Sequence, residues 1–229
     1  MSRPAAPAQS WIESMRRVDT PTVSNAIELL KLRPQEEGFA PLEIRCLFPE
    51  LGRMCGYAVT AQVETVSRTS AKDEESFIEL FEATYCSPKP AIIVYQEIGE
   101  RANFAVHSGE VMATIFRQLG AIGLVSDSAV RDLPEVRALG FHYFARGAAA
   151  SHANFRIVRT GIPVHVLGFP VETGDLLHGD ENGLIQIPSA AVESLPEAIA
   201  SVRSKEKALM DFVRTPGFVP GDLKGRFLH

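Results

Sequence analysis

Hydrophobic residues along this 229-residue chain fall into short runs separated by polar turns, with two different spacings. Some runs alternate with polar residues or are continuously apolar, and these predict β-strands at residues 56–66, 91–95 and 121–125. Residues 73–85 and 108–120 instead place apolar side chains at helical spacing, and Gly120 is suited to end the second helix. Strands that alternate with helices predict an α/β protein.

The segment 120–147 has the outline of a complete βαβ unit. Its first apolar run ends in a polar cluster at residues 126–132, and a short helical pattern follows at residues 133–139 before a second apolar run. Arg131 and Asp132 fall where the loop enters this helix, beyond the carboxyl end of the first strand. Open α/β sheets bind their ligands at that end of the strands. This loop is therefore the first candidate for a functional site.

The ends of the chain follow different patterns. A helical pattern covers residues 10–32 and breaks near Asp19, where either Thr20 or Asp19 is expected to cap a second helix with Pro21 in its first turn. Residues 33–52, rich in Pro, Gly and charge, predict a long surface excursion. Further strands are predicted at residues 157–160 and 163–169, and a last helix at residues 189–213. We expect one domain over residues 1–229, with an N-terminal helical extension at 1–51 and a C-terminal helix and tail at 189–229.

Composition narrows the class of protein. A hydrophobic content of 45% with 22% charged residues is ordinary for a soluble globular domain. The net charge of −5 and a pI near 5.7 argue against nucleic acid as a partner. No apolar run approaches the roughly 20 residues needed to span a bilayer, and no secretory signal is apparent. The three cysteines lack Cys-x-x-Cys spacing, so we expect a cytoplasmic protein with reduced, buried thiols and no membrane association.

The residues of the βαβ loop also have purely structural interpretations. Asp132 and Glu135 match a capping box with Asp in place of Ser or Thr, so spacing alone favours helix capping for Asp132. Asp127 is best explained as a turn former or a carboxylate that braces the loop. Glu110 in a first helical turn favours the helix dipole, and Ser108 is a plausible cap for that helix.

A functional interpretation joins these features at one crevice. Two helix N-termini, at Glu110 and at Asp132, would face each other, and their backbone amides would hold a small carboxylate. The two acidic side chains would meet a hard divalent cation directly or through water. Other chemistries are disfavoured, because the chain has no paired histidines for zinc, no nucleophile elbow, no nucleotide-binding glycine motif and no lysine in an apolar strand.

Three motifs together resemble the RraA-like family. They are Gly109-Glu110, then Asp127-Ser-Ala-Val-Arg131-Asp132, and Gly174-Asp175-Leu-Leu-His-Gly179-Asp180-Glu-Asn-Gly183. The resemblance covers about residues 52–188. It implies an αββα sandwich of the swivelling β/β/α type, assembled as a homotrimer or a homohexamer with its active site between subunits. The family includes metal-dependent pyruvate aldolases and a protein regulator of ribonuclease E.

The resemblance also implies roles for individual residues. Asp132 would ligate Mg²⁺ or Mn²⁺, Arg131 would contact the 2-oxo acid, and Glu110 would hold a metal-bound water. Glu206, on the last helix of a neighbouring subunit, is a positional candidate for a further carboxylate acting through water. His107 is a candidate substrate contact. The substrate carboxylate would bind to the backbone amides of Gly109, Glu110, Val111 and Met112.

The implied function is retro-aldol cleavage of a 4-hydroxy-2-oxo acid to release pyruvate. Oxaloacetate decarboxylation is an expected side activity, because both reactions pass through the enolate of pyruvate, whose charge a cation and Arg131 would stabilise. The alternative is a non-catalytic oligomeric regulator that binds a ribonuclease or another protein. Asp132 argues against that alternative, because the regulator branch lacks the acidic residue after the arginine. A third hypothesis is an unrelated oxo acid substrate, such as one derived from a sugar.

Overall fold

The structure is a computed structural model that describes residues 7–66 and 74–226, so the first six residues of the predicted N-terminal extension lie outside it. The described helices are α1 (Gln9–Met15), α2 (Thr20–Leu29), α3 (Glu74–Cys86), α4 (Glu110–Gln118), α5 (Leu133–Ala138) and α6 (Leu195–Val213). The described strands are β1 (Arg45–Cys46), β2 (Met54–Thr65), β3 (Ala91–Glu97), β4 (Ala121–Ser126), β5 (Ala129–Val130), β6 (His142–Ala145), β7 (Gly147–Ala148), β8 (Phe155–Thr160), β9 (Val164–Val166), β10 (Phe169–Val171), β11 (Leu176–Asp180) and β12 (Gly183–Ile187).

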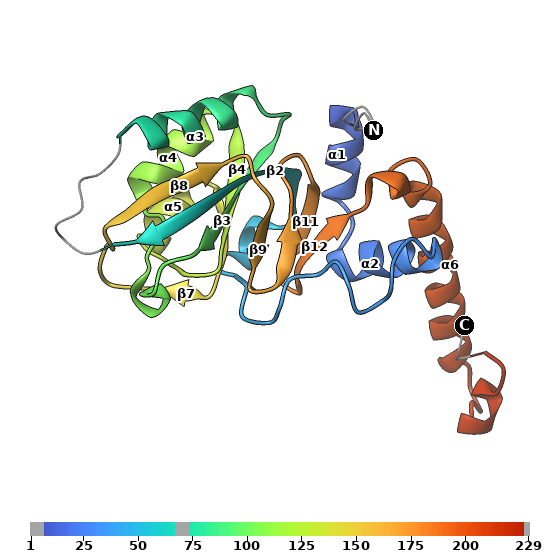
Figure 1. The fold of residues 1–229 in the computed structure, drawn as a ribbon. Helices are drawn as coiled ribbons and strands as arrows, with labels where there is room; N and C mark the ends of the chain where they lie inside the picture. The colour runs from blue at the N-terminus through green and yellow to red at the C-terminus, as the bar shows by residue number, and fades with distance from the viewer. Residues whose placement is uncertain (1–6, 67–73, 227–229) are drawn as a thin grey trace.

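Within these described ranges, eight strands form one mixed sheet in the order β1-β6-β4-β3-β2-β11-β12, with β8 also paired to β2 (Figure 1). Strands β2, β3, β4 and β6 are parallel neighbours. Helix α5 connects β4 to β6, so the predicted βαβ unit is confirmed. The α/β class is confirmed as well.

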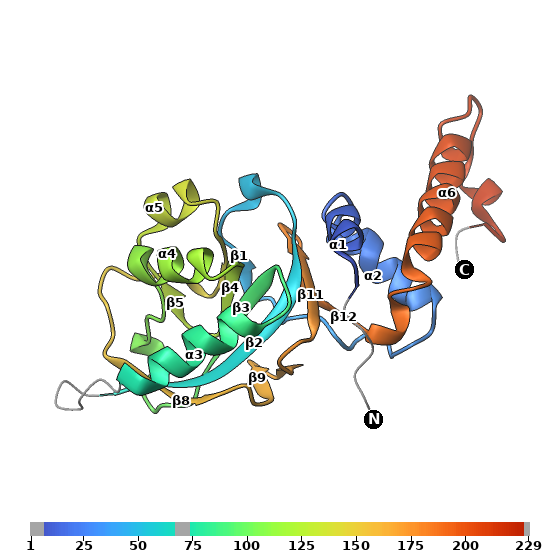
Figure 2. The same ribbon diagram turned by 90° about the horizontal axis from the view of Figure 1, so that it is seen from above.

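The central strands are buried on both faces, which explains why their sequences are continuously apolar. In β3, Ile93 and Tyr95 belong to the core under α3, α4 and α5. Ile92 and Val94, which alternate with them, belong to a second core that includes the β9–β10 hairpin. Figure 2 shows α3, α4 and α5 together on one side of the sheet. This layer places the start of α4 beside the carboxyl ends of β3 and β4.

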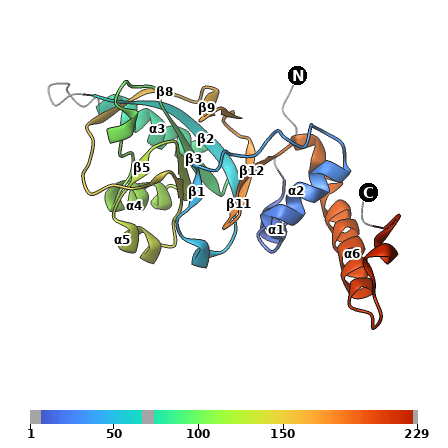
Figure 3. The same cartoon turned by 90° about the horizontal axis from the view of Figure 1, so that it is seen from below.

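A third core lies at the other end of the sheet, where α1, α2 and α6 pack near β11 and β12. Of the two expected cap residues, Asp19 is the one that caps α2, by accepting a hydrogen bond from the Thr22 amide at 2.9 Å. The buried carboxylate of Asp180 also accepts the Thr20 amide at 2.7 Å, which ties α2 to β11. The distal half of α6 extends away from the body (Figures 1 and 3). None of the helices in the described part of the chain is long and apolar enough to cross a membrane.

Two predictions about the first half of the chain are wrong. Residues 33–52 are not simply a surface excursion, because β1 pairs with β6 at the sheet edge and Phe48 is fully buried. Phe48 stacks on Tyr143 with ring centroids 5.6 Å apart, a long-range contact that no local periodicity reveals. The thiols are not uniformly buried either: Cys55 is buried, Cys46 is half-buried and Cys86 is exposed.

The last helix starts later than predicted. Residues 189–191 form a separate 3-10 turn, and α6 begins at Leu195 with a proline in its first turn. Proline is favoured at the start of a helix because the missing amide would have no partner there.

Candidate functional site

The lead into α4 runs alongside the lead into α5. The His107 amide donates to the Ala129 carbonyl at 2.9 Å, and the Arg131 amide donates to the Ser108 carbonyl at 2.9 Å. Val106 and Ala129 also form a parallel β-bridge. These bonds bring the two helix starts side by side. The predicted meeting of two helix N-termini is therefore confirmed.

Asp132 caps α4 rather than its own helix. Its Oδ2 atom accepts the Glu110 amide at 2.9 Å and lies 3.5 Å from Arg131 Nε. Asp132 has a left-handed backbone, with φ 57° and ψ 44°, and makes no side-chain cap bond to α5. The predicted capping box with Glu135 is thus wrong. The side chains of Arg131 and Asp132 remain 39% and 34% exposed, so both are accessible to a ligand.

Ser108 does not cap α4 either. Its hydroxyl accepts a hydrogen bond from Tyr143 at 2.9 Å, and the residue at the cap position is Gly109, which has no side chain to donate or accept. The plausible cap assigned from sequence is therefore wrong. The reason is that a carboxylate from a distant segment already occupies the end of the helix.

Gly109 permits this arrangement by its small size. A Cβ atom at this position would lie 2.4 Å from Asp132 Oδ2 and 2.8 Å from Arg131 Nε. The backbone of Gly109 is extended, with φ −139°, which any residue can adopt. The requirement for glycine is thus steric, set by the close approach of the Asp132 carboxylate.

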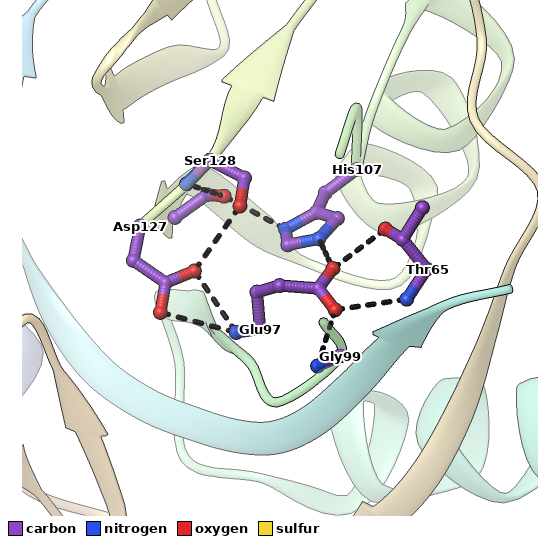
Figure 4. A network of polar contacts seen from close by, with 7 residues as sticks. Thr65, Glu97, Gly99, His107, Asp127 and Ser128 are labelled. Carbon is purple, nitrogen blue, oxygen red and sulfur yellow. Dashed lines mark hydrogen bonds and ion pairs between the residues drawn. The ribbon is translucent and has the colours of Figure 1, made fainter. Parts of the chain in front are cut away.

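A buried polar network, drawn in Figure 4, joins the lead into α4 to the ends of β3 and β4. His107 contacts Glu97 Oε2 through Nε2 and Ser126 Oγ through Nδ1, both at 2.8 Å. Glu97 also accepts hydrogen bonds from the amide and hydroxyl of Thr65. Burial alone would raise the pKa of Glu97, but the bonds from His107 and Thr65 hold this pKa below its usual range. Glu97 and Ser126 were not among the predicted site residues, although both end parallel strands at the edge where such sheets bind ligands.

Asp127 braces the same edge, as expected from the sequence. Its two carboxylate oxygens accept the Glu97 amide at 2.9 and 3.1 Å. Burial raises the pKa of Asp127 to about 6, even though the hydrogen bond from that amide opposes the rise.

His107, a predicted substrate contact, is fully buried. Both of its ring nitrogens are used by Glu97 and Ser126, so neither is available to a ligand. The residue borders a cavity of about 160 Å³ that Gly109, Met112 and Arg131 also line. In this structure His107 therefore has no ring nitrogen free to bond a ligand, although it forms part of the cavity wall.

Glu206 lies on α6, where it accepts a hydrogen bond from Asn25 at 3.1 Å. Figures 1 and 3 show α6 at the opposite end of the molecule from α4 and α5. One chain therefore does not bring Glu206 to Asp132. Across the described residues, no group of three or more His, Cys, Asp or Glu side chains is arranged to hold a metal ion.

The chain matches a family model described as RraA-like, Aldolase/RraA, over residues 20–186. It belongs to the RraA-like family. A Halalkalibacterium halodurans protein provisionally named 4-hydroxy-4-methyl-2-oxoglutarate aldolase is 31% identical over 111 residues, 46% of this chain and 53% of that protein. The matched segment thus spans about half the length of this curated relative.

Solved structures share the fold along most of the chain. An uncharacterised Pseudomonas syringae protein has a TM-score of 0.73 at 20% identity, covering 95% of this chain and 94% of that one. RraAS2 of Streptomyces coelicolor, described as an unusual member of the RNase ES inhibitor RraA family, has a TM-score of 0.67 at 21% identity. That match covers 92% of this chain and 98% of RraAS2. At these identities the likeness supports the fold alone.

The raised pKa of Asp127 predicts a pH-dependent stability. Because the folded protein holds this proton more tightly than an unfolded chain with a pKa of 3.8, the contribution is present below about pH 4 and lost as pH rises through about 6. A shift of this size corresponds to on the order of 3 kcal/mol. Asp127→Asn keeps an acceptor for the Glu97 amide but removes the titration. Urea unfolding of both proteins from pH 4 to 7 should show wild type losing stability relative to the variant, and a difference independent of pH would contradict this.

Gly109→Ala should break the contact between the Glu110 amide and Asp132, because the new methyl group would occupy the position of the carboxylate. Losing a helix cap costs about 1 kcal/mol, so we expect lower stability and faster hydrogen exchange of the Glu110 amide. Gly221→Ala is the matched control, since a Cβ there meets nothing within 4 Å. Unchanged exchange at Glu110 in Gly109→Ala would show that the close approach is not needed.

Proposed function

We propose that this protein is a divalent-metal-dependent lyase that cleaves a 4-hydroxy-2-oxo acid and releases pyruvate. The observation that carries the proposal is the Arg131–Asp132 corner, a partly exposed cation and anion held against the start of α4. The name of the Halalkalibacterium halodurans relative supports an aldolase activity. Oxaloacetate decarboxylation is proposed as a side activity of the same site.

The residues present fit Mg²⁺ or Mn²⁺. These ions keep several waters and need only one or two protein carboxylates together with substrate oxygens. Asp132 supplies such a carboxylate: Oδ2 is held by the Glu110 amide, and within the described residues no hydrogen bond to Oδ1 is found. When bound, the ion would act as a Lewis acid that stabilises the negative charge of the pyruvate enolate.

The protein groups supply the remaining chemistry. The Arg131 guanidinium provides a fixed positive charge for the oxo acid and for the oxyanion that develops on carbon–carbon cleavage. The substrate carboxylate binds at the first turn of α4, where amides lack partners within the helix. Asp132 already accepts the Glu110 amide, so the amides of the expected set that are left for the substrate are those of Gly109, Val111 and Met112. Glu110 is exposed in this turn and accepts the proton of the 4-hydroxyl group through a water.

The site of one chain is open to solvent, and we propose that a homo-oligomer completes it. Arg131 and Asp132 are each more than a third exposed, whereas charge stabilisation is strongest where water is excluded. A neighbouring α6 would cover the site and would bring Glu206 near the bound ion as a partner of its water shell. The projection of α6 from the body leaves its distal half available for that contact.

The proposed function predicts a metal requirement that depends on Asp132. Wild type supplied with Mg²⁺ or Mn²⁺ should release pyruvate from oxaloacetate and from 4-hydroxy-2-oxo acids, and EDTA should abolish this release. Asp132→Asn should lower kcat/KM by at least about 100-fold, because it removes a charged metal ligand. Arg131→Lys should lower kcat by about 100-fold, because it removes a planar donor to the oxyanion.

Glu135→Gln is the matched control for charge, since it removes an exposed carboxylate three residues away in the first turn of α5. It should retain wild-type turnover. Turnover that persists in EDTA, or full activity of Asp132→Asn, would overturn the mechanism. A wild-type protein that turns over none of these acids would instead favour the protein-binding regulator.

A further inference from the structure

The network of Figure 4 has no role in the chemistry proposed above, yet it joins three elements of the site. Glu97 ends β3, Ser126 ends β4, and His107 lies in the lead into α4. The side chains of Glu97 and His107 are 1% and 0% exposed, and Ser126 is fully buried. A buried polar network that is fully satisfied holds its members rigidly, whereas an incomplete one is costly.

The partners fix the proton positions in this network. Glu97 accepts four hydrogen bonds, from the Thr65 amide and hydroxyl, the Gly99 amide and His107 Nε2, so we assign the proton to Nε2. Ser126 Oγ accepts the Ser128 amide at 3.0 Å, so its own proton points to His107 Nδ1 at 2.8 Å. A neutral His107 thus satisfies every one of these groups.

A serine nucleophile is the alternative interpretation of a Ser–His–Glu chain. It does not fit, because Ser126 is fully buried and its Oγ is bonded to both His107 and the Ser128 amide. A nucleophile needs room for a carbonyl carbon near 3 Å and donors for the oxyanion. The chain of hydrogen bonds is therefore a means of holding the backbone.

The backbone of His107 and the residues that follow it connect this network to the site. Its amide donates to Ala129, and the next residue, Ser108, accepts the Arg131 amide. Gly109 follows, and the Asp132 carboxylate lies where a Cβ atom of that residue would be. The His107 side chain thus anchors the starts of α4 and α5 to the ends of β3 and β4. The 160 Å³ cavity beside Arg131 has His107 as part of its wall.

We propose that His107 is a positioning residue of the site: by joining Glu97 to Ser126 it sets the start of α4 against the Arg131–Asp132 corner. This inference rests on the proposed function for its kinetic consequence, though not for its structural one. The effect is expected to be large, because a misplacement of about 1 Å far from the chemistry costs about 100-fold in rate.

Two amide variants of His107 test separately its hydrogen bond to Glu97 and its hydrogen bond to Ser126. The Gln side chain places its amide near the position of Nε2 and keeps the donor to Glu97, whereas the shorter Asn side chain reaches only the position of Nδ1. His107→Asn therefore removes one of the four donors to the buried Glu97 carboxylate, the one at the Nε2 position. It should lower kcat on oxaloacetate about 100-fold with little change in KM, and His107→Gln should recover at least about tenfold of that loss.

His142→Asn is the control for removing a buried imidazole. His142 is 2% exposed on β6, and its Nδ1 has no hydrogen-bond partner. This variant is expected to lose thermal stability but to keep the kcat of wild type. Equal loss of kcat in His142→Asn and His107→Asn, or a wild-type kcat in His107→Asn, would overturn the positioning role.

Amide hydrogen exchange gives a second measurement that needs no turnover. In His107→Asn, exchange should become faster at Gly109, Glu110 and Arg131, and it should stay near wild type at these amides in His142→Asn and His107→Gln. Unchanged exchange in His107→Asn would overturn the inference even in an active enzyme. Altered exchange in a protein that turns over no oxo acid would support the inference and contradict only the proposed function.

Discussion

The site depends on one hydrogen bond, from the Glu110 amide at the start of α4 to the carboxylate of Asp132 at the start of α5. A negative charge at a helix N-terminus is favourable by about 0.3–1 kcal/mol, and by up to about 2 kcal/mol when partly buried. This gain offsets the left-handed backbone of Asp132, which costs about 1–2 kcal/mol in an L-residue. The same bond requires a glycine at position 109, because any Cβ there would overlap the carboxylate. The left-handed backbone of Asp132, the glycine at position 109 and the negative charge at the start of α4 are thus all tied to this one hydrogen bond.

The carboxyl ends of parallel β3 and β4 explain why so many polar groups gather behind this contact. The chain leaves the sheet twice at this edge, after β3 and after β4. The first residues of each connection are no longer in a strand, so their backbone groups need other hydrogen-bond partners. Asp127, just after β4, meets this need for the end of β3, since its carboxylate accepts the Glu97 amide. Glu97 stays charged because four donors surround it, whereas burial leaves Asp127 with a raised pKa. Hydrogen bonds therefore hold this edge of the sheet in place, while the pKa values of its two carboxyl groups are shifted in opposite directions.

Periodicity predicted the elements well and their partners poorly. Strands β2, β3 and β4 and helices α3 and α4 are long, regular and apolar, so local spacing is enough to place them. The βαβ unit also located Arg131 and Asp132 correctly at the switch from strand to helix. The spacing of residues did not reveal which helix Asp132 caps, because its hydrogen-bond partner is 22 residues away and belongs to another connection. It failed for Phe48 and Glu97 for the same reason, since each is buried by contacts distant in the sequence.

Capping would not compete with the metal binding that we propose for Asp132, because a carboxylate has two oxygens with different directions. Oδ2 is directed to the Glu110 amide, and this bond fixes the rotation of the carboxylate and hence the direction of Oδ1. A ligand oxygen that is already oriented loses little conformational freedom when an ion binds, so a single protein carboxylate becomes a more effective ligand. Under the proposed function, the helix cap would prepare Asp132 for binding the ion. A regulator that binds only proteins would gain nothing from this orientation, and Asp132 in such a protein could be replaced by any residue that closes the end of α4.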